Sequence, residues 1–257
     1  MTGRFDNKVV VITGAAGAIG RAAAVRFAVE GARVVLVDLA ASSLDDAVAA
    51  AKAAGADAFG VAADVTQSDD VERYATAATE RFGTIDCFFN NAGIEGAVKP
   101  LIEYPEEIFD RVIAVNLKGV WLGLKHVAAV MRKHSGGAIV NTASVAGLHG
   151  SRGIIAYVAS KHAVVGMTRV AALELAQDGI RVNAVCPSPI ETRMMRALES
   201  GLNPADPESV RARITAGNPM QRYGNPEEVA AVVAFLCSPD ASYINGGVYP
   251  IDGGSTA

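Results

Sequence analysis

The sequence has little cysteine, few charged residues and no concentration of histidine. Its three cysteines, Cys87, Cys186 and Cys237, lie far apart along 257 residues, which indicates neither a disulfide framework nor a zinc cluster. The four histidines share no ligand spacing, and we expect no metal site. Only 19% of the residues are charged, and the formal net charge is −4. Without basic clusters to neutralise phosphates, the chain is a poor candidate for binding nucleic acid.

Long apolar runs are also missing. No run approaches the roughly 18 residues that span a bilayer. After a polar start, Val9–Ile12 is too short for the core of a signal peptide. Hydrophobic residues nevertheless make up 51% of the chain, which excludes a disordered protein. We therefore expect a soluble, cytoplasmic protein that binds no membrane. Because no Pro/Ser/Gly-rich linker divides the chain, we expect a single domain over residues 1–257.

Short apolar runs alternate with longer alanine-rich stretches such as Arg21–Glu30, Leu44–Ala54 and Val71–Arg81. The alternation predicts an α/β fold: a doubly wound, parallel, seven-stranded sheet with helices on both faces. Residues 188–219 break the pattern, and we expect a substrate-binding segment or lid there without regular structure. The predicted strands are Val9–Thr13, Val34–Asp38, Ala58–Ala63, Ile85–Phe89, Ala138–Thr142, Val182–Val185 and Val248–Ile251.

A glycine-rich turn follows the first predicted strand and opens a helix, with glycines at Gly14, Gly17 and Gly20. In such sheets ligands bind beyond the carboxyl ends of the strands. Glycine at this turn lets the backbone approach a pyrophosphate at the helix N-terminus. Glycine is also common in ordinary strand–helix turns. The turn alone therefore leaves open whether it binds a cofactor or only connects the strand to the helix.

Asp38 closes the second predicted strand. An acidic side chain there can hydrogen-bond the adenosine ribose, and the alternative is a helix N-cap. The ribose interpretation favours NAD over NADP, because the 2′-phosphate of NADP would face a carboxylate. Arg21 and Arg33 are the only cations that could offset that repulsion.

Tyr157 and Lys161 stand four residues apart in a predicted helix, Tyr157–Leu175. Both therefore lie on one helix face, about 5–6 Å apart at Cβ, although a half-buried tyrosine beside a solvated lysine gives the same pattern. A cation about 4 Å from a phenol, at an effective dielectric constant of about 20, supplies roughly 4 kcal/mol, enough to lower the phenol pKa by about three units. Lys161 could thus make Tyr157 an acid/base catalyst near neutral pH, while Ser144 orients the substrate oxygen.

Further elements follow along the chain in a fixed order. With those above, the set is Thr13–Gly20, Asp64, Asn90–Gly93, Asn116, Ser144, Tyr157 with Lys161, and Ile251–Gly254. Together these elements resemble the short-chain dehydrogenase/reductase family over essentially the whole chain, in order and at the family's spacings. The resemblance implies a Rossmann-type fold and an NAD-dependent oxidoreductase that interconverts a secondary alcohol and a ketone by hydride transfer. It also implies a homotetramer paired through helices around 116–131 and 157–176, and we expect Trp121 in the core or in such an interface.

The resemblance also assigns roles. Tyr157 would exchange the proton, Ser144 would stabilise the reacting oxygen, and Lys161 would bind the nicotinamide ribose and lower the tyrosine pKa. Asn116 would hold a water that links Lys161 to solvent, a role compatible with a helix kink at this residue. Further cofactor contacts are expected at Gly14, Gly17, Ile19, Gly20, Asp38, Leu39, Asn91, Ala92, Gly93, Pro187 and Ile190, at the adenine (Asp64, Val65) and at the nicotinamide carboxamide (Thr192).

Three features depart from the family pattern. The family usually carries a glycine at position 18, but this chain has Gly17 followed by Ala18, which we treat as a tolerated small residue. Ser188 stands where a glycine usually follows the sixth strand. His149 and Arg152 precede the tyrosine and either face substrate or, as we favour, are solvated loop residues.

Residues 81–96 and 222–243 most resemble levodione-reductase-like members of the family, which act on cyclic ketones and secondary alcohols. This favours a small or cyclic substrate. The alternative is a 3-oxoacyl-(acyl-carrier-protein) reductase. Asp38 disfavours its NADPH, and Leu173 stands where those reductases commonly carry an arginine for the carrier. A non-catalytic NAD-binding sensor or scaffold is a third hypothesis, and the intact catalytic set argues against it.

Overall fold

The computed structural model describes residues 3–39, 44–134 and 136–257. Seven parallel strands form one sheet in the order β3-β2-β1-β4-β5-β6-β7, as the sequence pattern predicts. The first and last strands have the predicted ends, and the others differ from prediction by one or two residues. The strands are β1 (Val9–Thr13), β2 (Arg33–Asp38), β3 (Ala58–Ala62), β4 (Cys87–Asn90), β5 (Gly137–Thr142), β6 (Ile180–Pro187) and β7 (Val248–Ile251).

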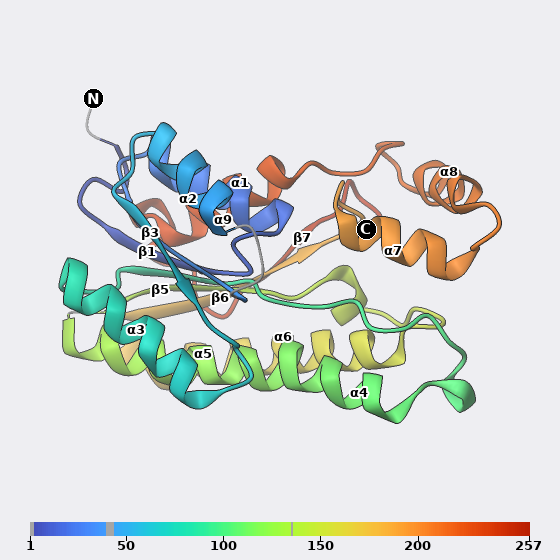
Figure 1. The fold of residues 1–257 in the computed structure, drawn as a ribbon, viewed down its shortest axis with the longest axis horizontal. Helices are drawn as coiled ribbons and strands as arrows, with labels where there is room; N and C mark the ends of the chain where they lie inside the picture. Colours follow the sequence, from blue (N-terminus) through green and yellow to red (C-terminus); the bar gives the residue numbers. More distant parts are fainter. Residues whose placement is uncertain (1–2, 40–43, 135) are drawn as a thin grey trace.

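Helices cover both faces of the sheet. On one face lie α1 (Ala18–Val29), α2 (Leu44–Ala53) and α9 (Pro226–Cys237) (Figure 1). The other face carries α3 (Ser68–Phe82), α4 (Glu106–Ile113), α5 (Val120–Met131) and α6 (Ile155–Leu175). Two further helices, α7 (Arg193–Leu202) and α8 (Pro207–Gly217), lie beyond one end of the sheet, apart from these two layers.

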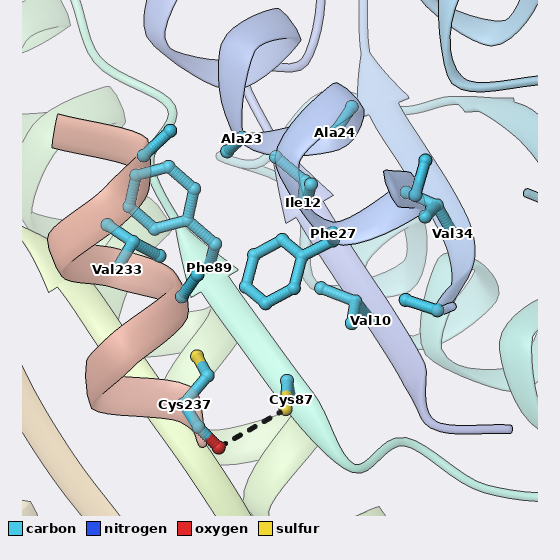
Figure 2. Close-up of a cluster of buried hydrophobic side chains, with 14 of the residues drawn as sticks. Val10, Ile12, Ala23, Ala24, Phe27, Val34, Cys87, Phe89, Val233 and Cys237 are labelled. Carbon is cyan, nitrogen blue, oxygen red and sulfur yellow. Dashed lines mark hydrogen bonds between the residues drawn. The ribbon is translucent and has the colours of Figure 1, made fainter. Parts of the chain in front are cut away.

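A hydrophobic core fills the space between the sheet and the layer of α1, α2 and α9. Phe27 of α1 is fully buried over the strand residues Val10 and Val34, and Phe89 of β4 reaches toward Val233 of α9 (Figure 2). Every residue of β1 is buried, which explains why its apolar side chains do not alternate with polar ones. A second core of the same kind lies under α3, α5 and α6.

The helical run Glu106–His134 is long and apolar enough, by length and composition alone, to cross a membrane. It has 29 residues, and its most apolar 18-residue window has a mean hydropathy of 1.2, but half of that window is buried inside the protein. Val120, Leu122 and Leu124 belong to the second core. The run therefore packs as the core helix of a globular domain.

A π-helix, Ala114–Gly119, joins α4 to α5. Such turns contain an extra residue and are frequent at functional sites. Asn116 lies in this turn, fully buried, and its amide donates to the Ser160 hydroxyl of α6 at 3.3 Å. The irregularity expected at Asn116 is therefore a π turn that directs the side chain toward the helix carrying Tyr157.

The expectation that residues 188–219 lack regular structure is wrong, because most of them form α7 and α8. Both helices begin with side-chain caps: Thr192 accepts from the Met195 amide, and Asp206 accepts from the Ser209 amide. Helix α7 is strongly amphipathic, with Met194, Met195 and Leu198 half-buried at helical spacing, so its periodicity could have been recognised. Helix α8 has no comparable apolar stripe and is held by ion pairs, which hydrophobic periodicity does not reveal.

Removing the Phe27 ring should leave a cavity in the first core. We expect Phe27→Ala to lower the free energy of unfolding by about 3–5 kcal/mol. Val29→Ala, two residues along the same helix at a side chain that is 68% exposed, should change it by less than about 0.5 kcal/mol. Urea denaturation of the two variants measures both values, and equal losses would contradict this packing.

Candidate active site

The order of the sheet reverses between β1 and β4, and sheets of this kind bind ligands beyond the strand ends at the reversal. Here the Thr13 hydroxyl accepts from the backbone N–H groups of Asn91 (2.9 Å) and Ala92 (3.1 Å). The Asn91 amide donates to the Thr13 carbonyl at 3.1 Å and accepts from the Thr142 hydroxyl at 3.0 Å. The Asn91 side chain thus holds the ends of β1, β4 and β5 together. This structural role was not part of the sequence-based expectation, which gave Asn91 only a cofactor contact.

The glycine turn after β1 has little space for side chains. Gly14 has a φ of +65°, and a Cβ on Gly20 would lie 2.3 Å from the Gly14 carbonyl oxygen. Gly17 caps α1 without a side-chain hydrogen bond and is exposed. Ala18 is exposed too, so its methyl group is accommodated without a clash, while Ile19 packs against the core. Gly20 therefore lets the first turn of α1 pack directly on the Gly14 backbone, and the exposed Gly17 adds no side chain at the start of the helix.

Asp38 lies beside this turn, at the carboxyl end of β2. Its carboxylate accepts from the Ala16 amide at 2.9 Å and from the Leu39 amide at 2.8 Å. Arg33 opens β2 at the opposite sheet edge, which removes it as a cation near Asp38. Arg21 stays close, because its guanidinium donates to the Ala16 carbonyl at 3.3 Å.

Lys161 is buried at the centre of the candidate site, with 3% of its surface exposed. Its Nζ donates to the Thr142 carbonyl at 2.7 Å. A Cβ on Gly93 would lie 3.6 Å from this Nζ and 3.3 Å from the Asn116 Oδ1. Asn116 in turn accepts from the Ile94 amide (2.8 Å) and donates to the Ile94 carbonyl (2.9 Å). The predicted Lys161, Asn116 and Gly93 are therefore brought together.

Tyr157 precedes Lys161 by one turn of α6, and the Lys161 Nζ lies 5.5 Å from the centre of its ring. Burial raises the pKa of Tyr157 to about 12, a hydrogen bond with Ser144 lowers it, and the charges of Glu95 and Cys186 raise it further. The pKa thus moves opposite to the sequence-based expectation. The loss of hydration around the buried hydroxyl dominates its pKa, whereas the expectation rested on the attraction of the ammonium alone.

Burial also lowers the pKa of Lys161 to about 8, with the nearby Cys186 acting in the opposite direction. Desolvation disfavours the charged form of each group, so it raises the pKa of a phenol and lowers that of an amine. Near neutral pH, Tyr157 keeps its proton and Lys161 keeps its charge.

Ser144 lies just past β5, where its hydroxyl accepts from the Ala146 amide (3.1 Å) and donates to the Pro187 carbonyl at the end of β6 (3.4 Å). Beyond Pro187, Ile190 is buried and pairs in a parallel bridge with Gly224. Thr192 caps α7 from the same short stretch. The cofactor contacts expected after β6 therefore lie on one well-anchored segment.

Asp64 and Val65 follow β3 on the other side of the reversal. The Asp64 carboxylate accepts from the Thr66 amide at 2.9 Å. A Cβ on Gly119 would lie 2.9 Å from Val65 Cγ2, so the valine packs directly on the π-helix. Both side chains are half-buried at the carboxyl edge, where the sequence places them.

Sequence reasoning missed groups that act through the backbone or through charge at a distance. The Thr142 and Ile94 carbonyls carry no sequence signal, because any residue supplies a carbonyl. Glu95 could have been noticed as a charge two residues after Gly93. His149 and Arg152 are exposed, as favoured above. Within the described ranges no three His, Cys, Asp or Glu side chains gather to hold a metal ion.

Sheets with this strand order bind dinucleotides at the reversal, and the side chains gathered there can exchange a proton. The class these features define is that of Rossmann-type oxidoreductases. Residues 14–256 match a family model described as Enoyl-(Acyl carrier protein) reductase. The chain belongs to the short-chain dehydrogenase/reductase family and is an oxidoreductase.

Curated relatives match over nearly the full length. Levodione reductase of Leifsonia aquatica is 47% identical (100% of this chain, 97% of that protein). Meso-2,3-butanediol dehydrogenase of Serratia marcescens is 44% identical (99% and 96%). Cyclohexanol dehydrogenase of Acinetobacter sp. (strain SE19) is 40% identical (100% and 98%). A 3-oxoacyl-[acyl-carrier-protein] reductase of Thermotoga maritima is 41% identical (98% of each).

Solved structures agree closely with the fold. The crystal structure of levodione reductase has a TM-score of 0.95 at 47% identity, covering 97% of this chain and 98% of that one. The crystal structure of NAD+-bound xylitol dehydrogenase has a TM-score of 0.93 at 38% identity, covering 97% and 99%. The resemblance inferred from sequence, including the levodione-reductase-like branch, is confirmed.

Burial of Lys161 predicts how stability changes with pH. The pKa of Lys161 is about 8 in the folded protein and 10.5 in an ordinary lysine. Between these values the unfolded chain holds the proton more tightly, so the free energy of unfolding rises with pH, by about 3 kcal/mol for this group. Urea denaturation of wild type and Lys161→Met at several pH values isolates the contribution. The same pH dependence in both proteins would contradict a buried ammonium.

Proposed function

We propose that the protein is an NAD-dependent oxidoreductase that interconverts a small or cyclic secondary alcohol and the corresponding ketone. The observation that carries the proposal is the buried Lys161 ammonium, which lies one helical turn from Tyr157 at the reversal of the sheet. Relatives that act on levodione, butanediol and cyclohexanol support the substrate class. The function is tested by following NADH absorbance over a panel of secondary alcohols with each cofactor.

The residues of the first turn fit a dinucleotide. Gly14 and Gly20 let the turn close tightly on the start of α1, and the exposed capping residue Gly17 adds no side chain there. We assign the pyrophosphate to this turn and the adenosine ribose to Asp38. When bound, NAD supplies or accepts the hydride. Its remaining contacts are assigned to Ile19, Leu39, Asp64, Val65, Asn91, Ala92, Gly93, Lys161, Pro187, Ile190 and Thr192.

The proton is handled by the chain itself. The high pKa of Tyr157 keeps its hydroxyl protonated near neutral pH, the form that donates to a ketone oxygen. Ser144, which lowers the pKa of Tyr157, lies close enough to that hydroxyl to orient the same ketone oxygen. Lys161 replaces the proton that Tyr157 gives up, since its own pKa lies near 8. Asn116 keeps the Ile94 backbone beside Lys161, where water can connect the ammonium to solvent. Oxidation runs the same transfers in reverse.

NAD is preferred to NADP in this proposal. The Asp38 carboxylate would repel a 2′-phosphate, and the NAD+-bound xylitol dehydrogenase structure supports the same choice. The one cation at this turn is Arg21, within the part of the chain that the structure describes, and it donates to a backbone carbonyl.

The alternative, a 3-oxoacyl-(acyl-carrier-protein) reductase, has a relative of similar sequence identity. The surface residue expected to bind the carrier protein does not support it. Leu173, where a carrier-binding arginine would be expected, is 81% exposed and cannot pair with an acidic carrier. The assembled proton-transfer residues argue against a non-catalytic sensor. We also propose that the protein forms a homotetramer, because Val170 and Leu173 of α6 and Trp121 of α5 leave apolar surface exposed on the two helices expected to pair. Its proposed location is the cytoplasm.

Tyr157→Phe removes only the hydroxyl that exchanges the proton. We expect turnover to fall about 10²–10⁴-fold, with the affinity for NAD retained. Tyr243→Phe, the same change at a fully exposed tyrosine, should leave turnover unaltered. Steady-state kinetics and NAD titration by fluorescence measure the two quantities. Wild-type turnover in Tyr157→Phe would refute the acid/base role.

Asp38→Ala removes the carboxylate expected at the ribose. The ratio of kcat/KM with NAD to that with NADP should fall by about tenfold, equivalent to about 1.4 kcal/mol. Asp46→Ala, which removes an exposed carboxylate of α2, serves as the control and should leave the ratio unchanged. An unchanged ratio in Asp38→Ala would remove this residue from cofactor selection.

A further inference from the structure

Val98 packs against glycines from two other segments. A Cβ on Gly201, near the end of α7, would lie 2.7 Å from Val98 Cγ2, and a Cβ on Gly153 would lie 3.3 Å from Val98 Cγ1. The Lys99 amide also donates to the Gly153 carbonyl at 2.8 Å. Any side chain at Gly201 would displace the valine, so the two backbones approach as closely as Val98 allows.

This contact lies at the far end of residues 93–98, a strip of chain that begins at the candidate active site. Gly93 adjoins the Lys161 ammonium, and Glu95 lies near enough to Tyr157 for its charge to raise the pKa of Tyr157. The Glu95 carboxylate also lies 4.0 Å from Arg193, the first residue of α7. Since Val98 meets Gly201 eight residues later, α7 runs alongside the strip for about 12 Å.

Helices α7 and α8 together form a cap beyond the end of the sheet. A network of ion pairs within this cap holds α7 in place. The buried Glu199 carboxylate accepts from the Tyr223 hydroxyl at 2.7 Å and from Arg196 at 2.7 Å. Glu191 pairs with both Arg196 and Arg211. The two guanidinium groups lie 5.8 and 4.8 Å from the centre of the Tyr223 ring. Swinging α7 outward would break the hydrogen bond between Glu199 and Tyr223 and the ion pair between Arg196 and Glu191.

We propose that Val98, wedged between Gly153 and Gly201, is a length gate that limits the enzyme to compact ketones and alcohols. A substrate that places its carbonyl at Tyr157 and extends between the strip and α7 meets the Val98–Gly201 contact. Cyclic and short-chain compounds end before it, whereas a long acyl chain has to displace it. The inference rests on the proposed function, which places the reacting carbonyl at Tyr157.

The test compares methyl ketones of increasing length, from butanone through hexanone and octanone to dodecanone, with cyclohexanone as the reference. Val98→Ala should raise kcat/KM for the longest ketones about tenfold relative to cyclohexanone, mainly by lowering KM. The kcat for cyclohexanone should stay the same. Val29→Ala, an equal truncation at an exposed site on α1, should leave the length profile unaltered. In the double variant V98A/G201A the added methyl refills part of the space, and the length limit should return in part.

Binding separates this inference from the proposed function. With NAD present and no reductant, ketones bind without turnover, and saturation-transfer NMR reports which members of the series bind. Long ketones bound by Val98→Ala but not by wild type support the gate. If wild type binds every length equally well, or if Val98→Ala leaves the length profile unchanged, the gate is refuted while the proposed function stands. If no ketone binds either protein, the proposed function fails and the gate fails with it.

Discussion

The site depends on one constraint: an ammonium group has to stay charged where water has been largely removed. Lys161 meets this requirement through the Thr142 carbonyl, 2.7 Å from its Nζ, and through a neighbour, Gly93, that has no side chain to crowd it. Moving a charge out of water is expensive unless it is paired or hydrogen-bonded. The strand ends, the π-helix and α6 therefore have to meet with little freedom, and the hydrogen bonds of Asn116 and Asn91 hold them there.

Much of the architecture could be predicted because its causes are local. Strands such as β1 and β7 are short apolar runs closed by turn residues, and their ends follow from those residues. Parallel strands bring their carboxyl ends to one edge. Thr13, Asp38, Ser144 and Tyr157 could therefore be assigned to the same region without any knowledge of their contacts. Spacing within α6 placed Lys161 beside Tyr157 for the same reason.

What could not be predicted depends on contacts between distant residues. Helix α8 has no clear apolar stripe and is held by pairs such as Arg211 with Glu191, which are separated by 20 residues. The direction of the Tyr157 pKa depends on how much water surrounds the hydroxyl, which follows from the whole fold and not from the four-residue spacing. The Asn91 side chain connects β1 and β5, a use that its place in a cofactor-binding motif does not reveal.

The π turn at residues 114–119 separates what the core needs from what the site needs. A π turn takes up one extra residue, so the α-helices on either side face nearly the same way as they would without it. Deleting one residue here would therefore leave Val120 and Leu122 in the core and Trp121 at the surface. It would, however, move Asn116 away from the Ile94 backbone and the Ser160 hydroxyl, to which it is now hydrogen-bonded. A deletion in this turn would thus spare the fold and damage the site.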